Sequence, residues 1–334
     1  MKKFFFIAAM VSAALISCTK NEPAPSMEAQ QEITFMTAPL TKAATITEFG
    51  AANRFRTWAF HDQADWTAGS TTAQLYLGGD AGLEIQKIGG VWKNDTQSYY
   101  WPKTGKLTFY SYSLNTTGTF LTDATVACTN AGITVTGYDI QKNLDVDFLV
   151  ADQEANKTAN VNTYYTEGVP TLFRHRLSNI IFKVQTAADY AGKTFMLESI
   201  TLNNVAKTAD YAQVAGTPAN DTWTITDEVN IVFSNDASSF SKTNVLTPAA
   251  KQSYYIPDTF AENDETVTIV YNVTTNNGSG TSTEKVTVTK SLKEIFGSWD
   301  KGNKYTCTIT VSLNEILWDP AVEEWTLVAD SWAI

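Results

Sequence analysis

Histidine and cysteine are scarce in this chain of 334 residues, which has two histidines and three cysteines. A zinc site needs several such ligands close together, and no Cys-x-x-Cys pair is present, so the sequence predicts neither a metal site nor a cofactor. His61 and His175 lie far apart, and no glycine-framed serine suggests a nucleophile beside a base. We therefore expect a protein that is not an enzyme, with His175 as a packed or capping residue.

Positive charge is also in short supply. The chain has 24 Lys and Arg against 35 Asp and Glu, which gives a formal net charge of -11. Proteins that bind nucleic acid need a basic surface for the phosphates, so nucleic acid is not an expected partner. An acidic balance favours solubility, and it suits a protein outside the cytoplasm.

The apolar run at the N-terminus is too short to be interpreted as a membrane-spanning helix. Residues 1–17 combine a positive start with this run, which is typical of an export signal. Because Cys18 directly follows a small residue, the stretch resembles a bacterial lipobox. That resemblance implies cleavage before Cys18, lipid on this residue and anchoring to the outer membrane at the cell surface. The alternative is an ordinary secretory signal with an incidental cysteine. Cys128 and Cys307 are then expected to be buried or free thiols.

Helical periodicity is nearly absent, apart from one short helix-like piece, "SLKEIFGSW". Apolar residues instead alternate with a period of two through two series of short segments, one from "EITFMT" to "DVDFLVAD" and one from "LSNIIFKVQT" to "KYTCTITVSL". This pattern predicts an all-β protein with two tandem β-sandwich domains. We expect a lipidated tether over residues 18–30, an N-terminal β-sandwich over 31–167 and a C-terminal β-sandwich over 168–334.

Two groups of residues raise the question of a binding or catalytic site. The first is the acidic cluster Asp145, Asp147, Asp152 and Glu154. It lacks the glycine-turned spacing of a calcium loop, and strand alternation predicts a solvated face instead. The second is a set of adjacent aromatic residues, which could form a sugar-stacking platform or pack across strands: Tyr99-Tyr100-Trp101, Tyr164-Tyr165 and Tyr254-Tyr255. A platform would favour a monomeric outer-membrane surface lipoprotein with a glycan-binding β-sandwich.

The chain ends in an apolar segment, "EEWTLVADSWAI", with no returning partner strand. Trp325 and Leu327 share one face of an extended strand, whereas Trp332 and Ile334 lie in the opposite register, so we expect a bulge or bend near "VADS". A bare apolar edge favours aggregation, so the segment needs a partner strand. It either completes its own C-terminal sandwich or pairs with another molecule.

Five segments together resemble the fimbrillin family of Bacteroidales, the Mfa-like and FimA-like lipoprotein pilins: "YYWPKTGKLTFYSYS", "DFLVAD", "FRHRLSNIIFKV", "LTPAAKQSYYIPD" and "WDKGNKYTCTITVSLNEILWDPAVEEW". The resemblance implies two transthyretin-like domains and assembly into type V pili that adhere to host or bacterial surface ligands. In such pilins a trypsin-like protease removes the first strand, and the C-terminal strand of another subunit fills the groove head-to-tail.

This resemblance assigns roles to three parts of the chain. Ile33 and Phe35 lie in the first strand, which would be displaced, and the donor strand would contain Trp325, Leu327, Trp332 and Ile334. The family often has Arg in the processing loop, whereas this chain has Lys42. A strictly Arg-specific protease would have to use Arg54 or Arg56, which begin a predicted strand that would shield them.

Overall fold

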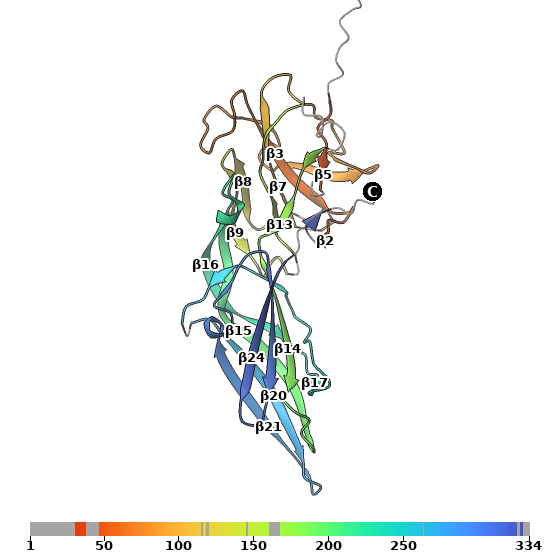
Figure 1. Ribbon diagram of the computed structural model, residues 1–334, viewed down its shortest axis with the longest axis vertical. Coiled ribbons are helices and arrows are strands. Elements are labelled where there is room, and N and C mark those ends of the chain that lie inside the picture. Colours follow the sequence, from red (N-terminus) through yellow and green to blue (C-terminus); the bar gives the residue numbers. More distant parts are fainter. Residues whose placement is uncertain are drawn as a thin grey trace, which may run out of the picture. The chain divides into compact units, whose positions relative to one another are not determined.

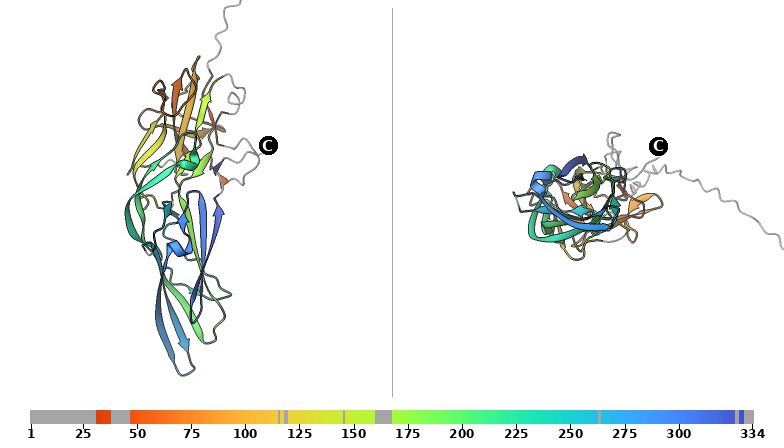
Figure 2. Two further views of the ribbon diagram at one scale, coloured as in Figure 1. Left: turned by 60° about the vertical axis from the view of Figure 1, so that its left-hand side comes forward. Right: turned by 90° about the horizontal axis from the view of Figure 1, so that it is seen from below.

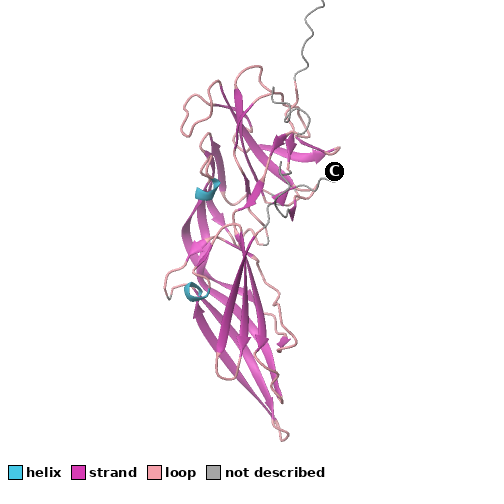
Figure 3. Ribbon diagram, viewed as in Figure 1, coloured by secondary structure: helices cyan, strands magenta, loops and turns pink. Residues whose placement is uncertain are grey.

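The computed structural model describes residues 31–37, 47–114, 116–117, 120–144, 146–159, 168–262, 264–325 and 328–329. Several residues singled out from the sequence lie outside these ranges: Cys18, Lys42, Asp145, Tyr164-Tyr165, Leu327, Trp332 and Ile334. Strands dominate the described residues, with one short α-helix, α2 (Leu292–Ile295), in the predicted helix-like piece and one 3-10 turn, Pro218–Asn220 (Figure 3). The predicted all-β class is confirmed.

Strands from the first half of the chain build most of a twelve-stranded sheet. Its order is β12 (Val169–Pro170), β1 (Phe35–Met36), β6 (Val91–Lys93), β5 (Leu83–Ile88), β3 (Arg54–Asp62), β7 (Lys106–Ser113), β10 (Leu149–Ala151), β13 (Phe173–His175), β25 (Val328–Ala329) and β2 (Thr47–Glu48). Figure 1 shows the strands β3, β5, β7 and β13 of this sheet. Two further strands pair at the side of this path, β4 (Gln74–Leu77) with β3 and β11 (Glu154–Lys157) with β7.

The two central strands of this sheet are buried on both faces. In β3, Phe55 packs in one core and Trp58 in a second core, and in β7 Phe109 and Tyr110 divide in the same way. These strands therefore have nearly continuous apolar and aromatic sequences instead of a strict alternation.

Strands mostly from the second half of the chain form a four-stranded sheet that packs against a seven-stranded sheet. The first has the order β18 (Tyr254–Tyr255), β14 (Ser178–Thr186), β23 (Asn303–Val311) and β24 (Ile316–Glu324). The second has the order β21 (Thr281–Ser291), β20 (Thr266–Asn276), β15 (Lys193–Ala212), β9 (Gly132–Asp139) and β8 (Thr125–Thr129), with β16 (Thr222–Ser234) and β17 (Ser239–Phe240) also paired to β15. A small pair joins β19 (Asp258–Thr259) and β22 (Ser298–Trp299).

Strand β15 connects segments from the two halves of the sequence. It pairs with β20 over Lys193–Asn203 and with β9 over Thr208–Ala212. Figures 1 and 2 show the yellow strands β8 and β9 continuing the sheet of the green β15. A single sheet therefore joins residues on both sides of position 168, and the predicted division of the chain into domains at that position stays a prediction.

Candidate functional site

The first strand occupies a slot between two other segments of the twelve-stranded sheet. On one side Phe35 and Met36 pair in parallel with Val169 and Pro170, and on the other side Phe35 pairs with Trp92. Further main-chain hydrogen bonds extend both edges, such as that from the Ile33 amide to the Tyr99 carbonyl, 2.7 Å. Residues 31–37 thus have the pairing of an internal strand, although they precede the rest of the fold.

Side chains of the first strand complete the aromatic core of this sheet. Ile33 and Phe35 are buried, as are Met36 and Thr37. The Phe35 ring meets Phe55 and Phe109 edge-on, with ring centroids 5.6 Å and 5.8 Å away. Burying one aliphatic or aromatic side chain of this size stabilises a fold by about 2 kcal/mol. The first strand is therefore held by side-chain burial in addition to its main-chain hydrogen bonds.

One wall of the slot requires a glycine. Gly168 has φ +90°, and a Cβ placed on it would lie 2.7–2.9 Å from the backbone atoms C, N and Cα of Phe35. Real Cβ atoms do not approach other atoms so closely, and L-residues with side chains avoid this φ value. Gly168 therefore lets the chain before β12 lie directly against the strand in the slot.

The C-terminal segment crosses from one sheet to another. Strand β24 is the edge of the four-stranded sheet, where it pairs only with β23, and its outer part is solvated: Leu317 is 63% exposed and Val322 is 55% exposed. The pairing ends at Trp325, and the next strand, β25, joins the twelve-stranded sheet between β13 and β2. The described strands therefore end at Glu324 and resume at Val328, and the predicted bulge or bend near "VADS", which includes residues outside the described ranges, stays a prediction.

The crossing point is held by a stack of rings. The Trp325 indole lies parallel to the His175 ring at 3.6 Å and to the Tyr254 ring at 5.2 Å. The Trp325 amide also donates to the Gly302 carbonyl at 2.7 Å. His175 belongs to β13 and Tyr254 to β18, so a single side chain bridges the twelve-stranded and four-stranded sheets.

His175 is a packed residue, as the sequence predicts. It is buried, and its Nδ1 lies 2.6 Å from Oδ2 of Asp147, which is also buried, with 3% of its surface exposed. The prediction of a solvated face is therefore wrong for Asp147. The reason is that β10 begins only at Leu149, so Asp147 precedes the strand whose alternation would have turned it outward.

The two other described acidic residues of this cluster, Asp152 and Glu154, each pair with a different cation. Asp152 forms a bidentate pair with Arg174, at 2.7 Å for both bonds, which raises the pKa of Arg174. Glu154 pairs with Lys157 at 2.7 Å. These carboxylates do not converge on one point, so the geometry does not support a shared catalytic or calcium-binding role.

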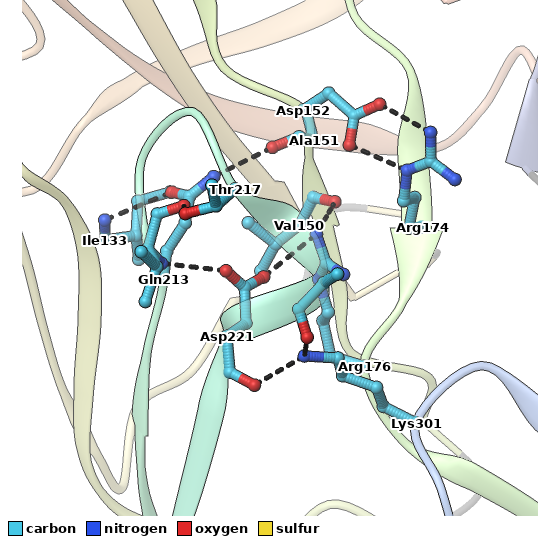
Figure 4. A network of polar contacts seen from close by, with 12 residues as sticks. Ile133, Val150, Ala151, Asp152, Arg174, Arg176, Gln213, Thr217, Asp221 and Lys301 are labelled. Atoms are coloured by element: carbon cyan, nitrogen blue, oxygen red, sulfur yellow. Dashed lines mark hydrogen bonds and ion pairs between the residues drawn. The ribbon is translucent and has the colours of Figure 1, made fainter.

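A buried ion pair fastens the turn between β15 and β16 to the start of the C-terminal sheets. Arg176 contacts Asp221 at 3.1 Å, and the Tyr211 hydroxyl donates to the same carboxylate at 2.7 Å. Burial, partly offset by Arg176, raises the pKa of Tyr211 well above its usual value, so the hydroxyl keeps its proton. Lys301 donates to the Asp221 carbonyl, and Figure 4 shows how these contacts adjoin the Arg174–Asp152 pair. Separating a buried ion pair would leave a buried charge without its partner, which costs on the order of 3–5 kcal/mol of stability. This cluster therefore holds the turn in place.

A second acidic cluster was not visible in the sequence. The carboxylate oxygens of Glu228, Asp258 and Glu265 lie within 4.8 Å of one another. Burial, together with the charges of Glu265 and Glu228, raises the pKa of Asp258 to about 6. Among the described residues this is the one grouping whose oxygens could surround a cation, but no further feature of the described surroundings indicates an ion. We therefore treat it as a site of charge repulsion.

The other residues singled out from the sequence are parts of the framework. Trp101 and Tyr255 are buried, so their segments do not present a continuous aromatic platform. Cys128 and Cys307 are free thiols, and burial raises the pKa of Cys307 to about 12.

The two arginines considered as processing sites lie in a paired strand. Arg54 forms an ion pair with Glu84, and the backbone of Arg56 lies between β5 and β7. A protease must accommodate an extended, unpaired segment, so both bonds are shielded in this fold. Cleavage at either residue, or at Lys42, stays a prediction.

Solved structures of other proteins share this fold. The chain is similar to a fimbrial protein from Bacteroides vulgatus, with 19% identity and a TM-score of 0.60 over 89% of this chain and 99% of that one. It is also similar to a putative cell adhesion protein from Bacteroides uniformis, with 17% identity and a TM-score of 0.53 over the same shares. At these identities the comparison shows a shared fold.

The family follows from the sequence itself. Residues 41–325 match the family model described as fimbrillin-like, and the chain therefore belongs to the fimbrillin-like family. This confirms the resemblance found from the five segments. No curated protein matches the chain significantly. Among the described residues, none of the helices is long and apolar enough to cross a membrane.

Proposed function

We propose that this protein is a structural and adhesive pilus subunit without catalytic activity. In this proposal it is exported as a lipoprotein through Cys18, and it reaches the cell surface attached to the outer membrane. A trypsin-like protease then cleaves after Lys42, and the first strand leaves together with the lipidated tether. The C-terminal segment of a neighbouring subunit enters the vacated slot.

The single observation that carries the proposal is the state of residues 31–37. They have main-chain partners on both edges and bury Ile33 and Phe35, yet only residues 37–46 connect β1 to β2. One cut in that connection would detach a complete internal strand and leave a groove with unpaired main-chain groups on both sides. Strand addition satisfies such a groove with main-chain hydrogen bonds and with pockets for alternate side chains.

The C-terminal segment has the properties of a donor. Its strand β24 lies at a sheet edge with most of its side chains exposed, so the side-chain contacts that oppose its release are mainly those of half-buried Ile316 and Trp318 and the ring stack of Trp325. A contact from the tail of one subunit to the slot of the next is heterologous and does not close, and it therefore produces a filament.

Strand capture by purified protein tests the proposal. A recognition sequence for a specific protease replaces residues 39–45, and the cleaved subunit is mixed with a fluorescent peptide of residues 316–334. We expect binding by the cleaved subunit, none by the uncleaved one, and none to a peptide of scrambled order. Equal binding before and after cleavage, or no binding after loss of the first strand, would contradict donor-strand exchange.

A further inference from the structure

The first strand and the C-terminal tail both adjoin one aromatic cluster, which consists of Phe35, Phe49, Phe55 and Phe173: the first strand contributes Phe35, and the tail pairs through its backbone with Phe173. Phe35 meets Phe55 at 5.6 Å, and Phe55 meets Phe173 at 5.4 Å. The backbone of Phe173 in turn pairs with Val328 of the tail. Two ring contacts, Phe35 with Phe55 and Phe55 with Phe173, therefore connect the first strand to β13, the strand that pairs with the tail strand β25.

A second connection runs through the backbone. Strand β2 pairs in parallel with the tail, with Thr47 opposite Val328 and Glu48 opposite Ala329. Phe49 follows β2 directly, and its buried ring stacks on Phe173 at 5.0 Å. The tail strand β25 thus lies between β13 and β2, and β2 is tied to the first strand through residues 37–46.

Cleavage between β1 and β2 acts on both connections. Loss of the first strand removes Phe35 from the cluster, so Phe55 loses a ring contact, and the effect reaches Phe173 through its contact with Phe55. The same cut turns the segment before β2 into a chain end, and strands near a free end fray more easily. Both effects weaken the strands that flank the tail.

We infer that the first strand locks the subunit's own C-terminal tail, so that its removal opens the slot and releases the tail in one step. The inference rests on the proposed function in two respects: it treats the tail as the donor, and it takes cleavage between β1 and β2 as the processing step. An unprocessed subunit can then neither accept nor donate a strand, and subunits do not polymerise before they are processed.

Hydrogen exchange tests the lock without any polymerisation. In the uncleaved protein the slot stays filled, so the variant Phe35→Ala changes only the packing. We expect exchange of the peptide covering residues 326–334 to accelerate by about tenfold, since local opening governs exchange. Phe240→Ala, which removes a buried ring of the C-terminal sheets, is the matched control and should leave tail exchange as in the wild type. Phe35→Leu retains most of the volume and should give an intermediate rate, with folding checked by circular dichroism. Unchanged tail exchange in Phe35→Ala, or an equal increase in Phe240→Ala, overturns the lock.

A mixing experiment separates the lock from strand exchange itself. Labelled subunits, cleaved or uncleaved, are offered to cleaved acceptors that lack residues 325–334 and so have no tail of their own. We expect capture of cleaved donors, none of uncleaved wild type, and partial capture of uncleaved Phe35→Ala. Equal capture of cleaved and uncleaved wild type refutes the lock while strand exchange stands. If even cleaved donors are not captured, strand exchange fails, and the hydrogen-exchange result alone decides the lock.

Discussion

The indole of Trp325 lies 3.6 Å from the imidazole of His175, and the two ring planes are 5° apart. His175 is in turn held by the buried carboxylate of Asp147 at 2.6 Å. The chain thus leaves the four-stranded sheet at a fixed point directly after β24. His175, which could have been considered as a catalytic base from the sequence, helps to form this point.

Replacement of Trp325 by Ala should therefore destabilise the protein. Lost stacking and burial predict a decrease of about 2 kcal/mol in the free energy of unfolding, measured by urea denaturation. Leu317→Ala, on the solvated part of β24, is the control and should change stability by less than about 0.5 kcal/mol. Equal effects of the two substitutions would mean that the ring stack does not hold the tail.

Gly168→Ala should weaken the slot more than its backbone strain alone explains. Gly297 also has a positive φ, +77°, but a Cβ there would meet nothing within 4 Å, so Gly297→Ala reports the conformational cost by itself. We expect a loss of about 1 kcal/mol for Gly297→Ala and about 1–2 kcal/mol more for Gly168→Ala, in thermal or urea unfolding. The additional loss of stability in Gly168→Ala over Gly297→Ala should disappear once the first strand has been removed. If this difference persists without the first strand, contact with that strand is not its cause.

Asp258 should make stability depend on pH. Its pKa is raised to about 6 in the fold against 3.8 for the free residue, so the folded state binds the proton more tightly. The free energy of unfolding should then fall as the pH rises from about 4 to about 6, and remain lower above that range. Asp258→Asn should stabilise the protein by about 1 kcal/mol at pH 7.5, allowing for solvent screening, and should have no effect at pH 4. Exposed Asp319→Asn is the control, and a destabilised Asp258→Asn at pH 7.5 would disprove the repulsion.

Replacement of Cys18 by Ala should prevent lipid attachment. Lipid chains give membrane affinity in proportion to their buried methylenes, so the variant should also fail to remain with the outer membrane. Metabolic labelling with a radioactive fatty acid and fractionation of the cells provide the measurement, with Cys128→Ser as the matched cysteine control. Lipid incorporation that persists without Cys18 would reject this residue as the anchor.

Deletion of residues 325–334 should leave a folded, secreted monomer that does not polymerise. Gel filtration and electron microscopy of processed protein measure this, with the Leu317→Ala variant as the control that keeps its tail. Filaments built from the truncated subunit would show that the tail is not the donor strand, and complete unfolding would show that the tail belongs to the core.

Local sequence patterns predicted those parts of the fold in which a strand has one buried face. β14 and β23 alternate between buried and mostly half-buried positions, and the pattern of their apolar residues shows this alternation. β3 and β7 lose the alternation because both of their faces are buried. Pairing between distant segments cannot be inferred from such patterns, which is why the continuation of β15 into β9 was not foreseen.

The candidate site was predicted to a similar extent. The apolar first strand and the unpaired chain end were apparent, since each is a local composition. From the sequence, Gly168 was considered only as a domain boundary. Its role in the slot could not be predicted because it depends on the backbone of Phe35, more than 130 residues earlier in the sequence. Likewise Glu228, Asp258 and Glu265 come together only through the pairing of distant strands.

The contact at Gly168 also determines what the slot can recognise. Because Gly168 faces the atoms N, Cα and C of Phe35, which every amino acid possesses, this wall tests the path of the entering chain and ignores its side chains. Selection by side chain is left to the aromatic core, where Ile33 and Phe35 are buried. Under the proposed strand exchange, a donor would therefore be chosen by the few side chains that replace these two, while the rest of its sequence would have only to follow the same backbone path.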